Sequence, residues 1–169
     1  MKKLPQREIG FSLVELLVAV AILGILTSMA VPSFIDILFI SSLRNTSNLL
    51  VSYATAARSE AIKRNALITL CKSSDGLVCT TSGGWEQGWI LRTPTEVITK
   101  ESPIASGYKV NCNVNSVIFD PVGVGPTVAT FKVCRYSPSP GSEERQVSIS
   151  ATGKAKVEKT ATGTCEVNL

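Results

Sequence analysis

Residues 10–35 read GFSLVELLVAVAILGILTSMAVPSFI, and this stretch decides the fold. Glu15 is its one charged residue, and the 20 residues from Leu16 to Ile35 carry no charged side chain. At a rise of about 1.5 Å per residue, a helix over them covers about 30 Å, the thickness of the hydrocarbon core of a bilayer. The sequence therefore predicts a membrane-spanning helix with an acidic residue near one end.

A carboxylate in such a segment is unfavourable, by about 2.5–3.5 kcal/mol at the bilayer centre and by less near an end. Ionisable groups in this position are rare, and a functional partner is the usual reason for them. The simpler alternative is that Glu15 reaches the headgroup layer and has no special partner. The residues that precede Glu15 favour the functional interpretation.

The chain begins with a basic segment that contains Lys2, Lys3 and Arg7. By the positive-inside rule these cations hold the start in the cytoplasm, so that the rest of the chain faces outward. The apolar stretch is too long for an ordinary secretory signal, and no A-x-A cleavage pattern follows it closely. A plain membrane anchor would fit the length but would not explain Glu15.

Residues 10–15 (GFSLVE), after this basic leader, resemble the leader-peptidase site of type IV pilins and type II secretion pseudopilins. The resemblance implies cleavage by prepilin peptidase between Gly10 and Phe11 and N-methylation of the new Phe11 amine. It also implies that Glu15 pairs with the amino terminus of a neighbouring subunit during assembly. An acid and an ammonium group in a low-dielectric seam stabilise each other's charge, which makes this pairing physically reasonable.

Composition points to one anchor helix and one modest globular domain, because the chain has 169 residues and 44% apolar content. Loss of residues 1–10 lowers the formal charge from +4 to +2, which does not favour broad nucleic-acid or phospholipid binding. The chain has no histidine, which excludes His-based triads and His-containing metal sites. No cofactor or metal is expected, and no residues suggest an assembled nucleophile, base and oxyanion site, so we expect no enzyme activity.

Five cysteines occur at positions 71, 79, 112, 134 and 165, with no C-x-x-C pair. Zinc ribbons and thioredoxin-type motifs are therefore not expected, and in an exported domain the cysteines suggest disulfides. Cys71–Cys79 would close a short loop, and Cys134–Cys165 would hold the C-terminal tail. Cys112 would then be a buried free thiol. Spacing alone does not fix this connectivity.

The first helix is expected to continue beyond the membrane, from Phe11 to about Asn65. Pro32 should kink it rather than end it, because the helical periodicity continues after it. Apolar and small residues then recur at spacings of three and four, at Leu43, Thr46, Leu50, Ala54, Ala57 and Ala61. Charged and polar residues (Arg44, Asn48, Ser52, Arg58 and Lys63) mostly lie off this stripe.

After Ala66 the pattern changes to short β-type runs separated by Gly, Pro and Ser clusters. The predicted strands are Leu67–Lys72, Trp89–Arg92, Val97–Lys100, Tyr108–Cys112, Val117–Asp120, Val128–Tyr136, Gln146–Ser150 and Lys154–Lys159, with a surface loop at Ser137–Ser142. The expected fold is α+β, the type IV pilin fold: a long N-terminal helix, transmembrane and then amphipathic, packed on an antiparallel β-sheet domain. The expected divisions are leader 1–10, transmembrane half-helix 11–35, amphipathic half-helix 36–66 and β-rich periplasmic domain 67–169.

The globular part resembles the GspH/FimT branch of minor pilins and pseudopilins, through several segments in the same order. They are Ala57–Arg64, Trp85–Ile90, Ile118–Gly123, Phe131–Cys134 and Arg145–Gly153. Each segment also has a purely structural interpretation. Trp85 and Trp89 are expected to pack against the sheet rather than to stack on a ligand, and Gly88, Gly123 and Gly153 are expected in turns.

Gly153-Lys154-Ala155-Lys156 resembles, with lysine for arginine, a G-R-x-R element linked to DNA binding in FimT-type competence pilins. On a strand Lys154 and Lys156 would point to one face and meet phosphates there. Lysine lacks the bidentate fork of arginine, and Glu158 nearby weakens the positive field. The alternative is an ordinary solvated strand face.

The resemblance implies a structural protein, a minor pilin of the priming or tip complex that initiates type IV pilus assembly. Its partners would be other minor pilins, the major pilin, prepilin peptidase and the inner membrane, which it would cross once before joining the extracellular pilus. One alternative is a minor pseudopilin of a type II secretion system. Another is a DNA-binding competence pilin of the FimT type.

Overall fold

The computed structural model describes residues 11–122, 127–136 and 143–166, apart from the side chains of residues 29–33. The expected leader, the expected loop at 137–142 and Gly123 lie outside these described residues. The chain divides into two compact units, Met1–Leu38 and Phe39–Leu169, and each is considered by itself.

Helix α1 spans Leu13–Arg64 and stays helical through position 32. Ser12 caps its start, because the Glu15 amide donates to Ser12 Oγ over 3.2 Å. Its end is closed by Asn65 at a φ of 49°, with the Ala66 amide donating to the Ala61 carbonyl over 3.2 Å. Asparagine tolerates this left-handed conformation, which commonly ends helices. The predicted helix from Phe11 to Asn65 is therefore confirmed to within two residues.

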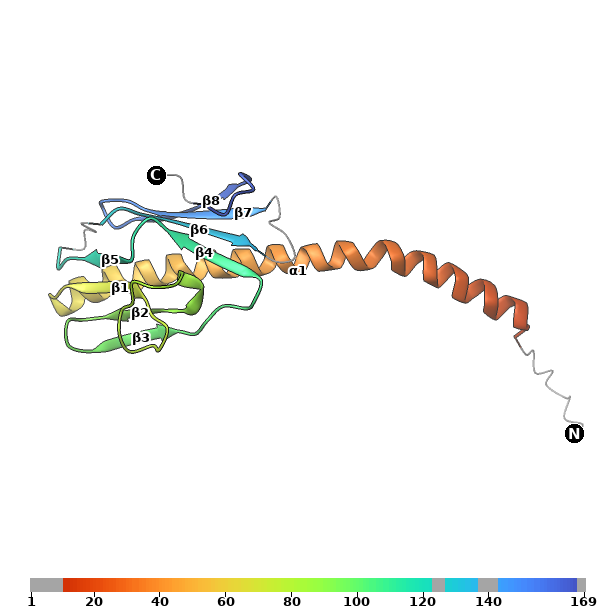
Figure 1. Ribbon diagram of the computed structural model, residues 1–169, viewed down its shortest axis with the longest axis horizontal. Coiled ribbons are helices and arrows are strands. Elements are labelled where there is room, and N and C mark those ends of the chain that lie inside the picture. Colours follow the sequence, from red (N-terminus) through yellow and green to blue (C-terminus); the bar gives the residue numbers. More distant parts are fainter. Residues whose placement is uncertain (1–10, 123–126, 137–142, 167–169) are drawn as a thin grey trace, which may run out of the picture. The chain divides into compact units, whose positions relative to one another are not determined.

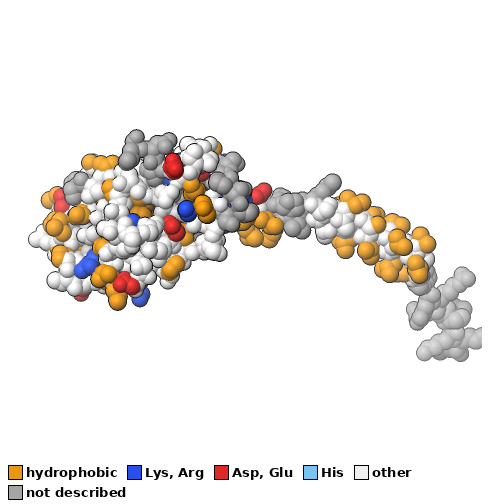
Figure 2. Space-filling model, viewed as in Figure 1, with side chains coloured by type: hydrophobic (Ala, Val, Ile, Leu, Met, Phe, Trp, Pro, Cys, Tyr) orange, Lys and Arg blue, Asp and Glu red, His pale blue; other side chains and the backbone are white. Residues whose placement is uncertain are grey.

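The helix of the first unit is apolar over its surface. From Leu13 to Leu26 its leucine, valine and isoleucine side chains are all more than half exposed, between 51% for Val18 and 78% for Leu13. Figure 2 shows hydrophobic side chains over the visible face of this helix. The expected membrane span 11–35 includes positions 29–33, whose side chains lie outside the described ones.

A helix with both the length and the mean hydropathy needed to cross a membrane is not found among the residues that the structure describes.

The part of α1 in the second unit is amphipathic, as its periodicity predicts. The stripe residues Leu43, Thr46, Leu50, Ala54, Ala57 and Ala61 are all buried. The off-stripe residues Arg44, Asn48, Ser52, Arg58 and Lys63 are all exposed. This face joins the hydrophobic core of the β-strands, in one cluster with Ile68, Leu70 and Phe131.

Among the described residues, the strands form two four-stranded antiparallel sheets (Figure 1). The first sheet has the order β3 (Val97–Glu101), β2 (Trp89–Arg92), β1 (Ile68–Lys72) and β5 (Ser116–Phe119). The second has the order β4 (Tyr108–Cys112), β6 (Ala129–Arg135), β7 (Glu144–Ile149) and β8 (Ala155–Thr160). A short 3-10 helix, η1 (Trp85–Gln87), precedes β2.

All the strands predicted from sequence occur, with ends shifted by at most two residues. The strands of each sheet are not consecutive in the chain. β4 pairs with β6 in the second sheet, whereas β5, which follows β4, pairs with β1 in the first sheet. The two sheets and the helix stripe share one core, which makes the fold α+β as predicted.

Candidate functional site

Glu15 lies in the first turn of α1, three residues after the cap residue Ser12. An acidic side chain is favoured there by the partial positive charge of the helix N-terminus. Within the described part of the chain, the Glu15 carboxylate takes part in no hydrogen bond or ion pair. The carboxylate is thus available to a group from another molecule.

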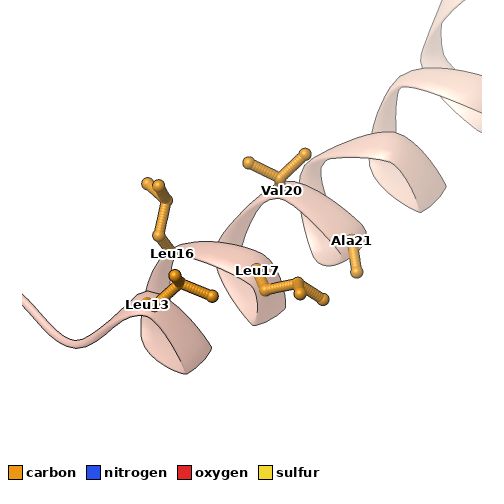
Figure 3. A pocket seen from close by; sticks show the side chains of 5 residues that line it. All are labelled: Leu13, Leu16, Leu17, Val20 and Ala21. Atoms are coloured by element: carbon orange, nitrogen blue, oxygen red, sulfur yellow. The ribbon is translucent and has the colours of Figure 1, made fainter.

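A shallow apolar groove runs along one face of the same helix, lined by Leu13, Leu16, Leu17, Val20 and Ala21 (Figure 3). These positions repeat at spacings of three and four and so share one face. Glu15 is about 200° around the helix from Leu13, because each residue turns the helix by about 100°. The acidic group and the groove therefore lie on opposite faces, and both faces are open to neighbours.

The polar side chains of this helical segment bond to its own backbone. Thr27 Oγ1 donates to the carbonyls of Leu23 and Gly24 over 2.9 and 3.0 Å, and Ser28 Oγ donates to the Ile25 carbonyl over 2.7 Å. Satisfied hydroxyl groups can enter an apolar environment at little cost. Glu15 is therefore the one unsatisfied charged group between Phe11 and Ser28 in the described structure.

The structure joins Cys71 to Cys79 and Cys134 to Cys165, the two pairs that sequence analysis favoured, with Cα–Cα distances of 5.6 and 5.7 Å. Cys112 is the free cysteine, as expected, but it is partly buried and not fully buried as predicted. It lies opposite Phe131, on the core side of β4, whereas Cys134 alternates to the other face of β6. Burial raises the pKa of the Cys112 thiol to about 11, which makes it a weak nucleophile.

Asp75 organises the loop closed by the first disulfide. Its Oδ1 accepts hydrogen bonds from the amides of Leu77 and Val78, over 2.8 and 3.1 Å, and from Ser73 Oγ over 3.0 Å. The two amides, together with Ser73, lower the pKa of the Asp75 carboxyl group. A small polar pocket of about 120 Å³ lies beside this loop, but both acidic side chains that line it already accept hydrogen bonds: Asp75 within the loop and Glu101 from the Tyr53 hydroxyl. In the described residues no group of three or more metal-ligating side chains occurs.

A buried polar network holds the C-terminal segment on the outer face of the second sheet. Glu144 Oε2 accepts hydrogen bonds from the Thr162 amide and Thr162 Oγ1, over 3.1 and 2.8 Å, and lies 3.6 Å from Lys132 Nζ. Lys132 Nζ donates to Thr162 Oγ1 over 2.7 Å. Burial raises the pKa of the Glu144 carboxyl group, but Thr162 and the charge of Lys132 outweigh it, so that the pKa is lowered from its usual value. The second disulfide fastens the same segment three residues later.

Lys154 and Lys156 are both exposed at the start of the edge strand β8. The strand begins at Ala155, so Lys154 lies in the turn before it rather than on the strand as predicted. Its carbonyl accepts from the Ser150 amide over 3.0 Å. Lys156 Nζ forms an ion pair with Glu158, which partly neutralises the candidate phosphate-binding face.

Trp85 and Trp89 belong to the core, as expected, with exposed fractions of 2% and 0%. The Trp85 ring packs edge-on against Phe131, and its Nε1 donates to the Val114 carbonyl over 3.2 Å. The Trp89 ring packs edge-on against Tyr53. Neither ring is open to stack on an outside ligand.

Sequence reasoning missed the Ser12 cap and the Lys132–Glu144 pair. The cap had a readable signal, because Ser12 and Glu15 have the S-x-x-E spacing of a capping box. The ion pair had no such signal, because its two residues meet only through the register of β6 and β7.

Comparison with known proteins agrees with this architecture. Residues 46–153 match the family model described as type II transport protein GspH, and residues 6–31 match the prokaryotic N-terminal methylation motif. No curated protein sequence matches the chain significantly.

Among solved structures, the type IV minor pilin FimU of Pseudomonas aeruginosa has a similar fold. One crystal form aligns with a TM-score of 0.60 and 21% identity over 75% of this chain and 96% of the solved FimU chain. A second form gives 0.57 and 20% over 73% and 100%. The minor pseudopilin EpsH from the type 2 secretion system of Vibrio cholerae aligns with a TM-score of 0.48 and 12% identity over 70% and 97% of the two chains.

The GspH match covers more than half of the chain, and the methylation motif includes Gly10, Phe11 and Glu15. The chain is thus a type IV pilin-like protein that belongs to the GspH/FimT family of minor pilins and pseudopilins.

Proposed function

We propose that this protein is a minor pilin of a type IV pilus and a structural component of the priming or tip complex that initiates pilus assembly. Before assembly it crosses the inner membrane once, with its C-terminal domain in the periplasm. Prepilin peptidase removes residues 1–10, and the new Phe11 amine is methylated. It then joins other minor pilins and the major pilin, acts as a structural subunit rather than an enzyme, and becomes part of the extracellular pilus.

The observation that carries this proposal is the Glu15 carboxylate at the start of an apolar helix, which has no partner among the described residues. In a seam between apolar helices it needs a counter-ion, and the Phe11 amine of an adjoining subunit supplies one. Removing one partner of such a buried pair costs about 3–5 kcal/mol, because the other charge is left uncompensated. The pair between Glu15 and the Phe11 amine therefore fixes the position along the helix axis at which one subunit packs against the next.

The apolar groove supports the same mechanism from the opposite face of the helix. Side chains from a neighbouring helix can enter the space between Leu13, Leu16, Leu17, Val20 and Ala21. A helix that is apolar on all sides is typical of one surrounded by lipid or by other helices. Each subunit can therefore contact one neighbour through the groove and another through Glu15.

Replacement of Glu15 tests the proposal. Glu15→Gln keeps the size of the side chain and removes its charge, so processing and membrane insertion should remain while recovery of the subunit in sheared pili falls. Glu158→Gln, which removes an exposed acid from β8, is the matched control and should not reduce recovery. Normal incorporation of Glu15→Gln would contradict the pairing mechanism.

Mass spectrometry of the purified subunit tests its maturation. The expected chain begins at methylated Phe11. An intact Met1, or a cut beyond Ala30, would rule out pilin-type processing. A minor pseudopilin of a type II secretion system would give the same mass, so co-purification decides between the two: the pilus proposal requires the other minor pilins and the major pilin.

DNA binding is the alternative function. The Lys156–Glu158 ion pair counts against it, because Glu158 partly neutralises the charge of Lys156. A gel-shift assay compares the parent chain with a Lys154→Ala, Lys156→Ala double variant. The control double variant changes the exposed Lys63 and Lys100, which lie on other elements. If the control and the test variant retain DNA equally, the two lysines form no DNA site.

A further inference from the structure

At one end of the second sheet, β4 begins and β6 ends beside α1 (Figure 1). Aromatic and basic side chains contact one another there. We name this the aromatic–basic cluster: Phe39, Tyr108, Lys109, Arg135 and Tyr136. The Phe39 ring centroid lies 5.9 Å from that of Tyr108, and Arg135 Cζ lies 4.7 Å from the Phe39 centroid. Lys109 Nζ lies 3.9 Å above the Tyr136 ring.

The cluster covers both faces of the sheet end. Tyr108 is opposite Arg135 in the ladder, and both contact Phe39 on the helix side. Lys109 is opposite Cys134 and so points to the other face, where it meets Tyr136. The Tyr136 ring is 56% exposed, and the other four side chains are partly exposed. The Lys109 ammonium group and the exposed Tyr136 therefore lie on the outer side of this edge, and Tyr108 is partly exposed on the helix side.

The position of Phe39 in the chain ties the cluster to the membrane boundary. Phe39 follows Ile35, the last residue of the uncharged stretch, by four residues. Four residues reach at most about 14 Å even when fully extended. If the stretch spans the bilayer, the cluster begins within reach of the headgroup layer whatever the arrangement of the two units.

The chemistry of the cluster fits that layer. Tyrosine is enriched at membrane interfaces, since its ring is apolar and its hydroxyl is polar. Lysine and arginine keep their charged ends at phosphates while their stems cover apolar surface. Lys109 forms no ion pair within the described residues. The surface therefore suits the phosphate that is common to all phospholipid headgroups.

We propose that, before assembly, the aromatic–basic cluster docks on the phospholipid headgroup layer and holds the globular unit against the membrane surface. This inference rests on the membrane insertion proposed above. Docking of this kind would orient the second unit before it meets its partners, and its contacts with lipid would be lost when the subunit enters the pilus.

Hydroxyl-radical footprinting of the full chain tests the proposal, because the radical oxidises exposed side chains. The chain is compared in nanodiscs of phosphatidylethanolamine and phosphatidylglycerol and in an amphipathic polymer that lacks phosphate headgroups. Oxidation of Tyr136 should be severalfold slower in nanodiscs. Leu77, which is 64% exposed in the disulfide loop, is the internal control and should react equally in both.

A variant with Lys109→Gln should regain much of the Tyr136 oxidation in nanodiscs, whereas Lys156→Gln should not. Circular dichroism of both variants checks that they fold. Insertion is measured separately, as retention in the nanodisc after carbonate treatment. Equal Tyr136 oxidation in both media with the chain inserted would overturn the docking proposal alone. Loss of the chain from the nanodisc would overturn the membrane insertion and the docking together.

Discussion

Lys132 on β6 and Glu144 on β7 form an ion pair inside the protein, with 3.6 Å between Nζ and Oε2 and exposed fractions of 4% and 1% for the two side chains. Thr162 bonds to both residues, so the pair and the C-terminal segment form one network. Such a pair stabilises the fold only as long as both partners are present. Several consequences can be measured on the full chain in detergent.

Lys132→Met should lower the free energy of unfolding by about 3–5 kcal/mol, because it leaves a buried carboxylate without its counter-ion. Lys156→Met, which breaks an exposed pair with Glu158, should cost less than about 1 kcal/mol. Urea unfolding curves of the two variants give the comparison. Equal losses of unfolding free energy in the two variants would show that the buried pair stabilises the fold no more than the exposed pair does.

Stability should fall in acid through Glu144, whose pKa is lowered in the folded protein. A group with a depressed folded pKa stabilises the fold above its unfolded pKa, about 4.3 for glutamate, and this contribution is lost as the pH falls through the folded value. Between pH 5 and pH 3, Glu144→Gln should therefore lose less stability than the parent chain. Parallel slopes of unfolding free energy against pH would contradict the assignment to Glu144.

Gly88→Ala should be strongly destabilising. Gly88 has a φ of 109°, and a Cβ there would lie 2.6 Å from the Glu101 carbonyl oxygen. Gly163→Ala is the matched control, since its φ is 71° but, among the described residues, no atom beyond its chain neighbours lies within 4 Å of the added Cβ. The control should cost only the conformational term of about 1–2 kcal/mol. Equal melting temperatures for the two variants would contradict the expected steric clash at position 88.

Cys112 should resist alkylation in the native state at pH 8, because its pKa is raised to about 11 by burial. Iodoacetamide should then add one label in denaturant without reductant, and almost none without denaturant. Mass spectrometry counts the labels. Three labels in denaturant would mean that one of the two disulfides is not formed, and rapid native labelling would mean that the thiol is open to solvent.

Local sequence determined the elements of this protein. The 20 uncharged residues after Glu15, the stripe from Leu43 to Ala61 and the alternating runs after Ala66 all act within a few residues of one another. Helical and strand periodicities are short-range, so the pattern at each position shows which side chains share a face. The GFSLVE motif is also a run of adjacent residues, so it can be recognised in the sequence. Together these local patterns predict the α+β fold without knowledge of any tertiary contact.

The tertiary structure alone decided the arrangement of those elements. That β4 pairs with β6 and β5 with β1, that the strands divide into two sheets, and that Lys132 meets Glu144 all depend on register between distant segments. The aromatic–basic cluster arises in the same way, since Phe39 and Arg135 lie 96 positions apart in the chain. Backbone hydrogen bonding allows many such pairings, and the burial of one common core selects among them, which is a property of the whole chain and of no single segment.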